Sequence, residues 1–271
     1  MAKAARIEPP FEDSRDFVQS LARGLSVLRA FDARHTRLSL ADIAARTAMS
    51  RAAARRLVMT LEHLGYVRGS GREYSLSPSV LELGFGYLGS INLTDLAQPL
   101  LEDLARTVNQ SSSMAVLDGQ SIVYVLRVPG RRIMSVTLGV GARLPAFSAS
   151  MGRVLLSGLD ELALDRWLED CRPVRLTPHT VVDTRRLRRI VEEVRRQGHA
   201  YVEQELELGL CSLAVPVHNA DGHIATAINV SMPYHPDAER EAMRIILPQL
   251  KLTAAAIEAC APSHRLPAVG T

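Results

Sequence analysis

Hydroxyl and amide side chains gather in two parts of the chain that a small ligand could use. Ser148 and Ser150 lie in a loop of small residues before an expected helix, and Ser212, Asn229 and Ser231 lie on two expected strands late in the chain. Because the first backbone N–H groups of a helix have no partner within it, the start of this helix could hold a carboxylate. The same serines could instead cap the helix and satisfy the sheet. A small organic anion and a purely structural role therefore both fit these residues.

The other chemically active residues do not form a set that predicts catalysis. The sequence has no His/Cys spacing typical of a metal site, no nucleophile-elbow motif and no phosphate-binding glycine loop. Cys211 with His199 or His218 could act as nucleophile and base, but a buried structural thiol is the more ordinary explanation. We therefore expect no enzyme, no metal and no cofactor. A thiol or hydrolytic enzyme with a helix-turn-helix docking module remains the alternative from another class.

Arginines on one face of an expected helix point to DNA. In residues 50–64, apolar side chains recur at helical spacing, and Arg51, Ala52, Arg55 and Arg56 lie on the opposite arc. The small alanines permit close approach to a duplex, and an arginine can bind guanine bidentately or hold a phosphate. The alternative is a solvated face in an ordinary helical bundle.

Two short helices joined by a sharp turn must position these arginines. Residues 38–64 have apolar faces at helical spacing, with Ser39 and Ser50 placed as N-caps and only residues 47–49 between the helices. This is the layout of a helix-turn-helix, whose second helix enters the major groove. Two short strands around residues 69–71 then predict a hairpin, which favours a winged helix.

The charge distribution supports a polyanion-binding module at one end of the chain. The net charge of the 271 residues is only +3, yet residues 18–77 hold ten Arg against two Asp and two Glu. An architectural DNA-binding protein whose C-terminal part only oligomerises would share this pattern. The three cysteines are odd in number and widely spaced, which favours a reducing compartment, and no stretch reads as a signal peptide or membrane span. We therefore expect a cytoplasmic protein.

The remaining pattern predicts an α+β protein. A winged helix-turn-helix domain (18–77) follows a flexible arm (1–17), and a strongly apolar helix (78–92) forms a linker that must pack against another surface. After it, helices bracket strands of period 2, among them residues 133–140, which indicates an antiparallel sheet of about five or six strands over residues 93–262. A basic helix at 184–196 is expected to be a solvated face, and residues 263–271 form a tail.

Several long motifs resemble the IclR family of bacterial transcription regulators. The segments are QSLARGLSVLRAFD, RAAARRLVMTLEHLGYV, RLPAFSASMGRVLLS and GHAYVEQELELGLCSLAVPVHNADGHIATAINVS, so the resemblance covers about residues 18–262. It implies a GAF-like α+β effector-binding domain with an antiparallel sheet, a homodimer through the DNA-binding domains and often a dimer of dimers. Within the family, the chain is most similar to regulators of protocatechuate, 4-hydroxybenzoate and β-ketoadipate catabolism.

Both expected sites can be stated residue by residue. The predicted contacts to double-stranded operator DNA are Arg23, Ser50, Arg51, Ala52, Arg55, Arg56, Arg68 and Arg72. The effector pocket implied by the resemblance falls on Ser150, Met151, Glu203, Ser212, Asn229 and Ser231. The resemblance implies a small organic acid such as protocatechuate, 4-hydroxybenzoate or β-ketoadipate, with glyoxylate, pyruvate or homogentisate as alternatives.

The sequence departs from the family pattern at three positions. Val202 stands where many members carry an acid, with Glu203 beside it, and Asn229 stands where other members have a serine. The difference at Val202 bears on which effector is bound. Ala48 replaces the usual glycine of the helix-turn-helix turn.

Overall fold

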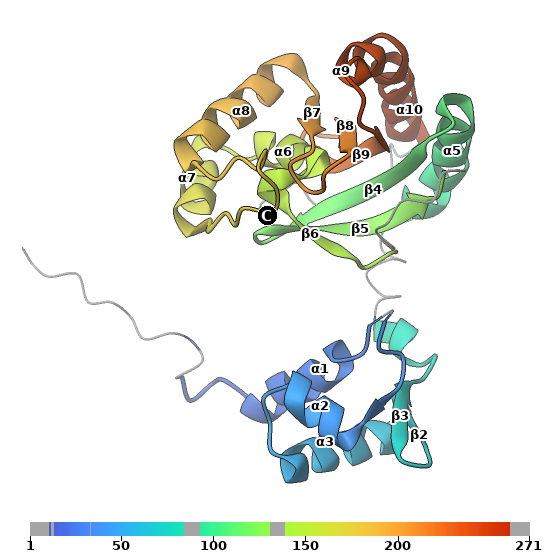
Figure 1. The fold of residues 1–271 in the computed structure, drawn as a ribbon, viewed down its shortest axis with the longest axis vertical. Coiled ribbons are helices and arrows are strands. Elements are labelled where there is room, and N and C mark those ends of the chain that lie inside the picture. The colour runs from blue at the N-terminus through green and yellow to red at the C-terminus, as the bar shows by residue number, and fades with distance from the viewer. Residues whose placement is uncertain (1–10, 12–13, 33, 84–92, 131–138, 261–271) are drawn as a thin grey trace, which may run out of the picture. The chain divides into compact units, whose positions relative to one another are not determined.

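The chain divides into two compact units in a computed structural model. The units span Met1–Tyr87 and Leu88–Thr271 (Figure 1). The structure describes all residues except 1–10, 12–13, 33, 84–92, 131–138 and 261–271. The division falls inside the expected linker, residues 78–92, of which only 78–83 are described; residues 80–83 are helical. The tail and most of the expected arm and linker therefore lie outside the described residues.

The N-terminal unit packs three helices against a small antiparallel sheet with strand order β1-β3-β2. The apolar faces of the helices meet in a core that includes Val27, Ile43, Val58 and Leu61. This confirms the expected winged helix-turn-helix. Its elements are α1 (Gln19–Arg29), β1 (Leu38–Ser39), α2 (Leu40–Arg46), α3 (Arg51–His63), β2 (Val67–Ser70) and β3 (Glu73–Leu76).

Side-chain caps fix where α2 and α3 begin. The Ser39 hydroxyl accepts a hydrogen bond from the Asp42 N–H, and the Asp42 carboxylate accepts one from the Ser39 N–H, which forms a capping box. The Ser50 hydroxyl accepts from the Ala53 N–H at 3.2 Å. Between the helices, Ala48 has φ 53°, the left-handed region that an L-residue other than glycine adopts at a cost. Alanine in place of the usual glycine therefore puts strain on the backbone of this turn.

The C-terminal unit is built on a six-stranded antiparallel sheet with strand order β6-β5-β4-β9-β8-β7. Two hairpins, β4–β5 and β8–β9, join at its centre through the pairing of β4 with β9. The strands are β4 (Ser111–Asp118), β5 (Ser121–Val128), β6 (Arg143–Pro145), β7 (Ala200–Glu203), β8 (Leu210–His218) and β9 (Ile224–Pro233).

Helices cover both faces of this sheet, as Figure 1 shows. One apolar core joins a sheet face to α5 and the C-terminal helices, and a second core joins the other face to α6, α7 and α8. The alternation of β8 serves both cores, since Leu213 and Val215 belong to the first and Ala214 to the second. The helices are α5 (Leu93–Val108), α6 (Ser150–Ser157), α7 (Glu161–Asp170), α8 (Thr184–Gln197), α9 (Ala238–Glu241) and α10 (Leu247–Cys260).

The structure refines three sequence expectations here. Ser150, expected in the loop before a helix, is the first residue of that helix, and a single 3₁₀ turn (Ala146–Ser148) precedes it. Near the C-terminal end of the described chain, a π-helical segment, Ala242–Ile246, lies between α9 and α10. Strand β7 was missing from the sequence interpretation, and most of the expected strand at 133–140 lies outside the described residues.

The basic helix α8 begins at the Asp183 cap and ends at Gly198, as expected. Three of its arginines are tied to acidic neighbours. Arg188 pairs with Glu161, Asp165 and Glu192, Arg195 pairs with Glu161, and Arg196 pairs with Glu193. These partners engage the three guanidinium groups, which supports a structural surface rather than a second nucleic-acid site.

Candidate DNA interface and ligand cavity

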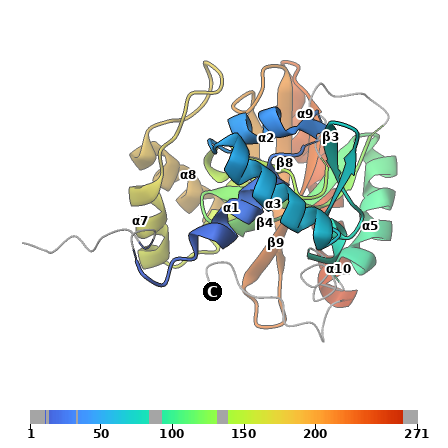
Figure 2. The ribbon, with the colours of Figure 1, turned by 90° about the horizontal axis from the view of Figure 1, so that it is seen from below.

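Helix α3 places its arginines in solvent. Ala54, Val58 and Leu61 are buried in the core, which turns the opposite arc of the helix outward. In Figure 2 this helix runs across the N-terminal unit. Within the described part of the chain, no ion pair with a carboxylate involves the candidate arginines. Every candidate DNA contact is exposed: Arg23, Ser50, Arg51, Ala52, Arg55, Arg56, Arg68 and Arg72.

A side chain of α3 hydrogen-bonds to the wing. The Glu62 carboxylate, near the end of α3, accepts a hydrogen bond from the Gly69 N–H of β2 at 2.9 Å. The hairpin turns at Gly71 and Arg72, where Gly71 has φ +66°, which glycine adopts without strain. Arg68 and Arg72 are therefore held at fixed positions relative to the arginines of α3.

In the C-terminal unit, a cavity lies between the start of α6 and one face of the sheet. The atom-free space between its walls, open solvent at the mouth included, is about 540 Å³. Five of the six expected effector residues line it, namely Ser150, Met151, Ser212, Asn229 and Ser231. The lining is completed by Tyr124, Arg127, Leu144, Ser148, Ala149, Val202, Leu206 and Leu210.

Strand pairing explains why Glu203 is absent from these walls. Val202, Ser212 and Ser231 are register partners on β7, β8 and β9, so their side chains share one face of the sheet. Glu203 follows Val202 directly, and successive residues of a strand point to opposite faces. Its carboxylate accepts instead from the Tyr201 hydroxyl at 3.3 Å. Valine therefore forms this part of the cavity wall.

Sequence reasoning missed Tyr124 and Arg127. Three residues apart on β5, they would face opposite sides of a regular strand. The pairing of β4 with β5 shifts register between Met114 and Ala115, so Arg127 pairs with Ser113 and Tyr124 with Ala115. This irregularity brings both side chains to the cavity face, a common use of a β-bulge. Alternation alone offered no signal for it.

The walls of the cavity carry little charge. Among its lining residues, all within the described part of the chain, Arg127 carries the one formal charge. Burial raises the pKa of Tyr124 to about 12, so its hydroxyl stays protonated at neutral pH. The Ser212 hydroxyl donates to the Ser150 hydroxyl at 2.9 Å, which ties β8 to the first residue of α6. The arrangement can hold a single anionic group beside neutral hydrogen-bonding groups.

A buried ion pair holds the loops around α6 in place. Arg153 Nη2 lies 2.7 Å from Glu205 Oε1, and both side chains are almost fully buried. Arg153 Nε also donates to the Phe147 carbonyl at 3.1 Å. Burial lowers the pKa of Arg153, and the Glu205 carboxylate opposes that shift. The pair thus joins α6 to the 3₁₀ turn before it and to the loop after β7.

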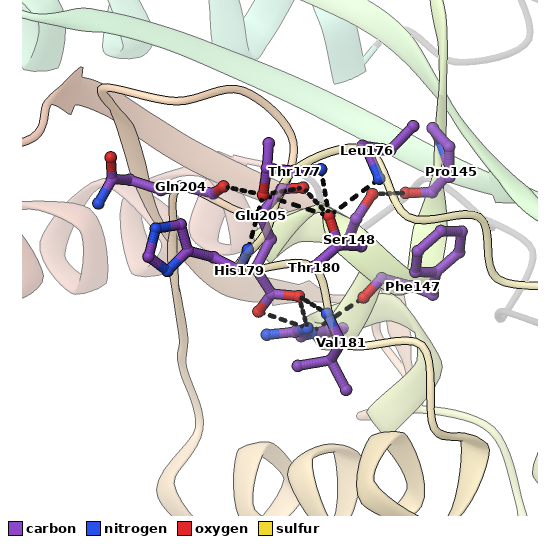
Figure 3. Close-up of polar contacts among 11 residues, drawn as sticks. Pro145, Phe147, Ser148, Leu176, Thr177, His179, Thr180, Val181, Gln204 and Glu205 are labelled. Atoms are coloured by element: carbon purple, nitrogen blue, oxygen red, sulfur yellow. Dashed lines mark hydrogen bonds and ion pairs between the residues drawn. The ribbon is translucent and has the colours of Figure 1, made fainter.

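The same pair fixes a third segment, as Figure 3 shows. The Val181 N–H donates to the Glu205 carboxylate at 2.9 Å. The Thr180 hydroxyl donates to the Glu205 carbonyl at 2.7 Å, and the Thr177 hydroxyl donates to the Gln204 carbonyl at 2.6 Å. The loop between β7 and β8, which carries Leu206 to the cavity, is therefore anchored on its outer side.

The thiol alternative finds no support in the geometry. Cys211 is fully buried in the core on the sheet face opposite the cavity, and burial raises the pKa of its thiol. The His218 ring is bound to Glu258 through Nδ1 at 2.7 Å.

Across the described residues, no group of three or more His, Cys, Asp or Glu side chains could hold a metal ion. Among the same residues, no helix is long and apolar enough to cross a membrane.

Comparison with known proteins identifies the family. Residues 20–71 match the model described as the IclR helix-turn-helix domain, and residues 85–259 match the bacterial transcriptional regulator IclR C-terminal model. The chain belongs to the IclR family. Its domain order is thus that of IclR-type regulators.

Relatives of this IclR-family chain place it among regulators of aromatic catabolism. It is 43% identical over 232 residues to the Pca regulon regulatory protein of Pseudomonas putida (85% of this chain, 80% of that protein). It is 35% identical over 246 residues to the p-hydroxybenzoate hydroxylase transcriptional activator of Acinetobacter baylyi (89% and 91%). A solved IclR homologue from Microbacterium hydrocarbonoxydans, complexed with 4-hydroxybenzoate, matches with a TM-score of 0.77 at 26% identity (89% and 98%).

These matches confirm the expected protein class and the expected branch of the family. The chain is a DNA-binding, ligand-responsive transcription regulator and not an enzyme. The thiol or hydrolytic alternative is therefore set aside.

Proposed function

We propose that this regulator binds a small aromatic acid in the cavity of its C-terminal unit and controls a catabolic operon in response. The observation that carries the proposal is Arg127, the single charged group among neutral and apolar cavity walls. A carboxylate at this position would gain a charge-assisted hydrogen bond, and the unpaired N–H groups at the start of α6 add a favourable field. Protocatechuate, 4-hydroxybenzoate and β-ketoadipate are the candidate effectors.

Calorimetric titration of the full chain with these acids tests the cavity. Arg127→Met should weaken acid binding by roughly tenfold or more, because it removes the charged partner of the carboxylate. Arg143→Met is the matched control, since Arg143 lies on the neighbouring strand β6, pairs with Asp118 and does not line the cavity. Equal acid affinity in the wild type and the Arg127 variant would contradict the site.

For DNA, we propose that Arg51, Arg55 and Arg56 face base edges from α3, and that Ser50 and Ala52 allow close approach. Arg23, Arg68 and Arg72 would meet phosphates. Arg55→Ala should then cost about 1–3 kcal/mol and relax sequence preference. Arg72→Ala should weaken specific and non-specific DNA alike and reduce the salt dependence. Fluorescence anisotropy with the DNA upstream of its own gene measures both, and an unchanged affinity of the Arg55 variant would contradict the assignment of α3.

A homodimer through the N-terminal unit is also part of the proposal. A groove between α1 and α3 is lined mainly by apolar residues, with Arg23 and Arg56 also among its walls, and Leu21, Leu25, Leu64 and Leu83 are strongly exposed along it. A second copy would cover the exposed leucines, leave the two arginines to the DNA and place two α3 helices on half-sites about 34 Å apart. Leu25→Glu should produce monomers in sedimentation measurements, and an unchanged mass would exclude this interface. The mass of the wild type in the same sedimentation measurements distinguishes a dimer from a dimer of dimers.

A cytoplasmic location completes the proposal. Cys171, Cys211 and Cys260 are all free thiols, as expected in a reducing compartment. The operator DNA of a bacterial regulator lies in the same compartment.

A further inference from the structure

One polar atom of the cavity has no partner. Asn229 on β9 is 3% exposed and lines the cavity. Its amide nitrogen donates to the Ser231 hydroxyl at 3.2 Å, whereas its Oδ1 is buried without a hydrogen-bond partner. A buried acceptor without a donor is costly, and such groups in native proteins call for an explanation. Because Asn229 lines the ligand cavity, a bound ligand is the candidate partner for this atom.

This acceptor discriminates between classes of acid. A carboxylate placed against Asn229 Oδ1 would bring two acceptor oxygens together without a proton between them. A hydroxyl group would instead supply the missing donor. With Arg127 as the one charged residue of the described walls, the cavity offers one place for a carboxylate and a separate place for an O–H group.

The strand register sets the distance between these two places. Arg127 on β5 pairs with Ser113 on β4, and Ser113 pairs with Asn229 on β9, so the three residues form one row across the sheet. Two strand spacings separate the outer members of the row by about 9.6 Å at the backbone. Arg127 and Asn229 both line the cavity, and the residue between them, Ser113, has a small side chain. A benzene ring with substituents at opposite ends suits this spacing.

Resting on the proposed function, we infer that Asn229 accepts a hydrogen bond from a ring hydroxyl of the effector while Arg127 holds its carboxylate. The cavity therefore selects hydroxy-substituted aromatic monoacids over unsubstituted benzoate and over aliphatic dicarboxylates. Benzoate leaves Oδ1 unpaired. A dicarboxylate such as β-ketoadipate brings a second negative charge and no O–H donor.

Calorimetry on the full chain with 4-hydroxybenzoate, benzoate and β-ketoadipate tests the inference. Wild type should bind 4-hydroxybenzoate at least about tenfold more tightly than either other acid, the ratio expected when a buried acceptor is left unpaired. Asn229→Leu removes the acceptor at similar volume and should bring the ratio of 4-hydroxybenzoate to benzoate close to one. Thr226→Val is the matched control, because Thr226 is buried on the same strand with an unpartnered hydroxyl but lies outside the cavity. It should keep the wild-type ratio.

The possible outcomes distinguish a failure of this inference from a failure of the proposed function on which it rests. Equal affinity of wild type for benzoate and 4-hydroxybenzoate, or tighter binding of β-ketoadipate, would overturn the inference while leaving an acid-binding cavity. A full wild-type ratio retained in Asn229→Leu would also overturn it. Failure of all three acids to bind would instead contradict the proposed function. The wild-type comparison requires no substitution, so the test stands even if a variant folds poorly.

Discussion

Arg153 and Glu205 form a buried ion pair that joins helix α6 to the loop after β7. Their side chains are 4% and 9% exposed, and Nη2 lies 2.7 Å from Oε1. Ser150, one turn before Arg153, opens α6 at the cavity, and Leu206, next to Glu205, lines the same cavity. The pair therefore fixes two walls of the ligand site from behind without lining the site itself.

Removing one member of this pair should be strongly destabilising. Arg153→Met leaves the Glu205 carboxylate buried without its cation, and the free energy of unfolding should fall by about 3–5 kcal/mol. Urea denaturation of the full chain measures the change. The control is Arg106→Met, which breaks an ion pair with Asp103 whose side chains are 72% and 70% exposed; there the expected change is within about 1 kcal/mol. Equal losses in both variants would refute the structural role of the buried pair.

Gly152 allows the start of α6 to pack closely on the preceding turn. A Cβ at this position would lie 2.1 Å from the Ala146 carbonyl oxygen. Gly152→Ala should therefore destabilise the protein by about 1–3 kcal/mol and weaken acid binding. Gly24 of α1 has nothing within 4 Å of such a Cβ. Because Gly24 lines the groove proposed as the dimer interface, the comparison is made in the Leu25→Glu background, where Gly24→Ala should act in the opposite direction and stabilise by about 0.5–1 kcal/mol. Thermal unfolding distinguishes the two, and the same sign in both would contradict the close packing.

The turn of the helix-turn-helix stores backbone strain at Ala48, whose φ is 53°. Ala48→Gly should raise the free energy of unfolding by about 1 kcal/mol, since glycine adopts this conformation without steric cost. The matched variant is Ala45→Gly, an exposed position inside α2, where glycine should cost about 1 kcal/mol. Denaturation of the two variants should give opposite signs. A loss of stability in Ala48→Gly would show that the turn is not strained.

The raised pKa of Tyr124 predicts that the folded protein loses stability at alkaline pH. Burial raises its pKa from the ordinary 10.0 to about 12, so the folded chain holds this proton more tightly than the unfolded chain. Its contribution is complete below pH 10 and is lost as the pH rises through about 12. Tyr124→Phe should therefore flatten part of the fall in stability over that range. Burial also raises the pKa of Tyr201, so some pH dependence should persist. A profile identical to that of wild type would contradict the assignment.

The sequence predicted the helical parts of the molecule more fully than the cavity. Helix ends depend mainly on neighbouring residues. The structure confirms the caps at Ser39 and Ser50, and it shows α8 running from the Asp183 cap to Gly198. The cavity depends on long-range strand register. The shift between β4 and β5 that turns Arg127 inward has no local signature. Which of Val202 and Glu203 faces the cavity likewise depends on the register of β7, which the sequence alone does not give.

The proposed regulator requires one coupling, in which an acid held by Arg127 changes how the N-terminal unit binds DNA. Fluorescence anisotropy with the upstream DNA, with and without 4-hydroxybenzoate, measures it directly in wild type and in Arg127→Met. The two proteins should bind DNA equally without the acid, and the acid should shift the DNA affinity of wild type but not of the variant at the same concentration. An equal shift in both proteins, or no shift in wild type with any of the candidate acids, would contradict it.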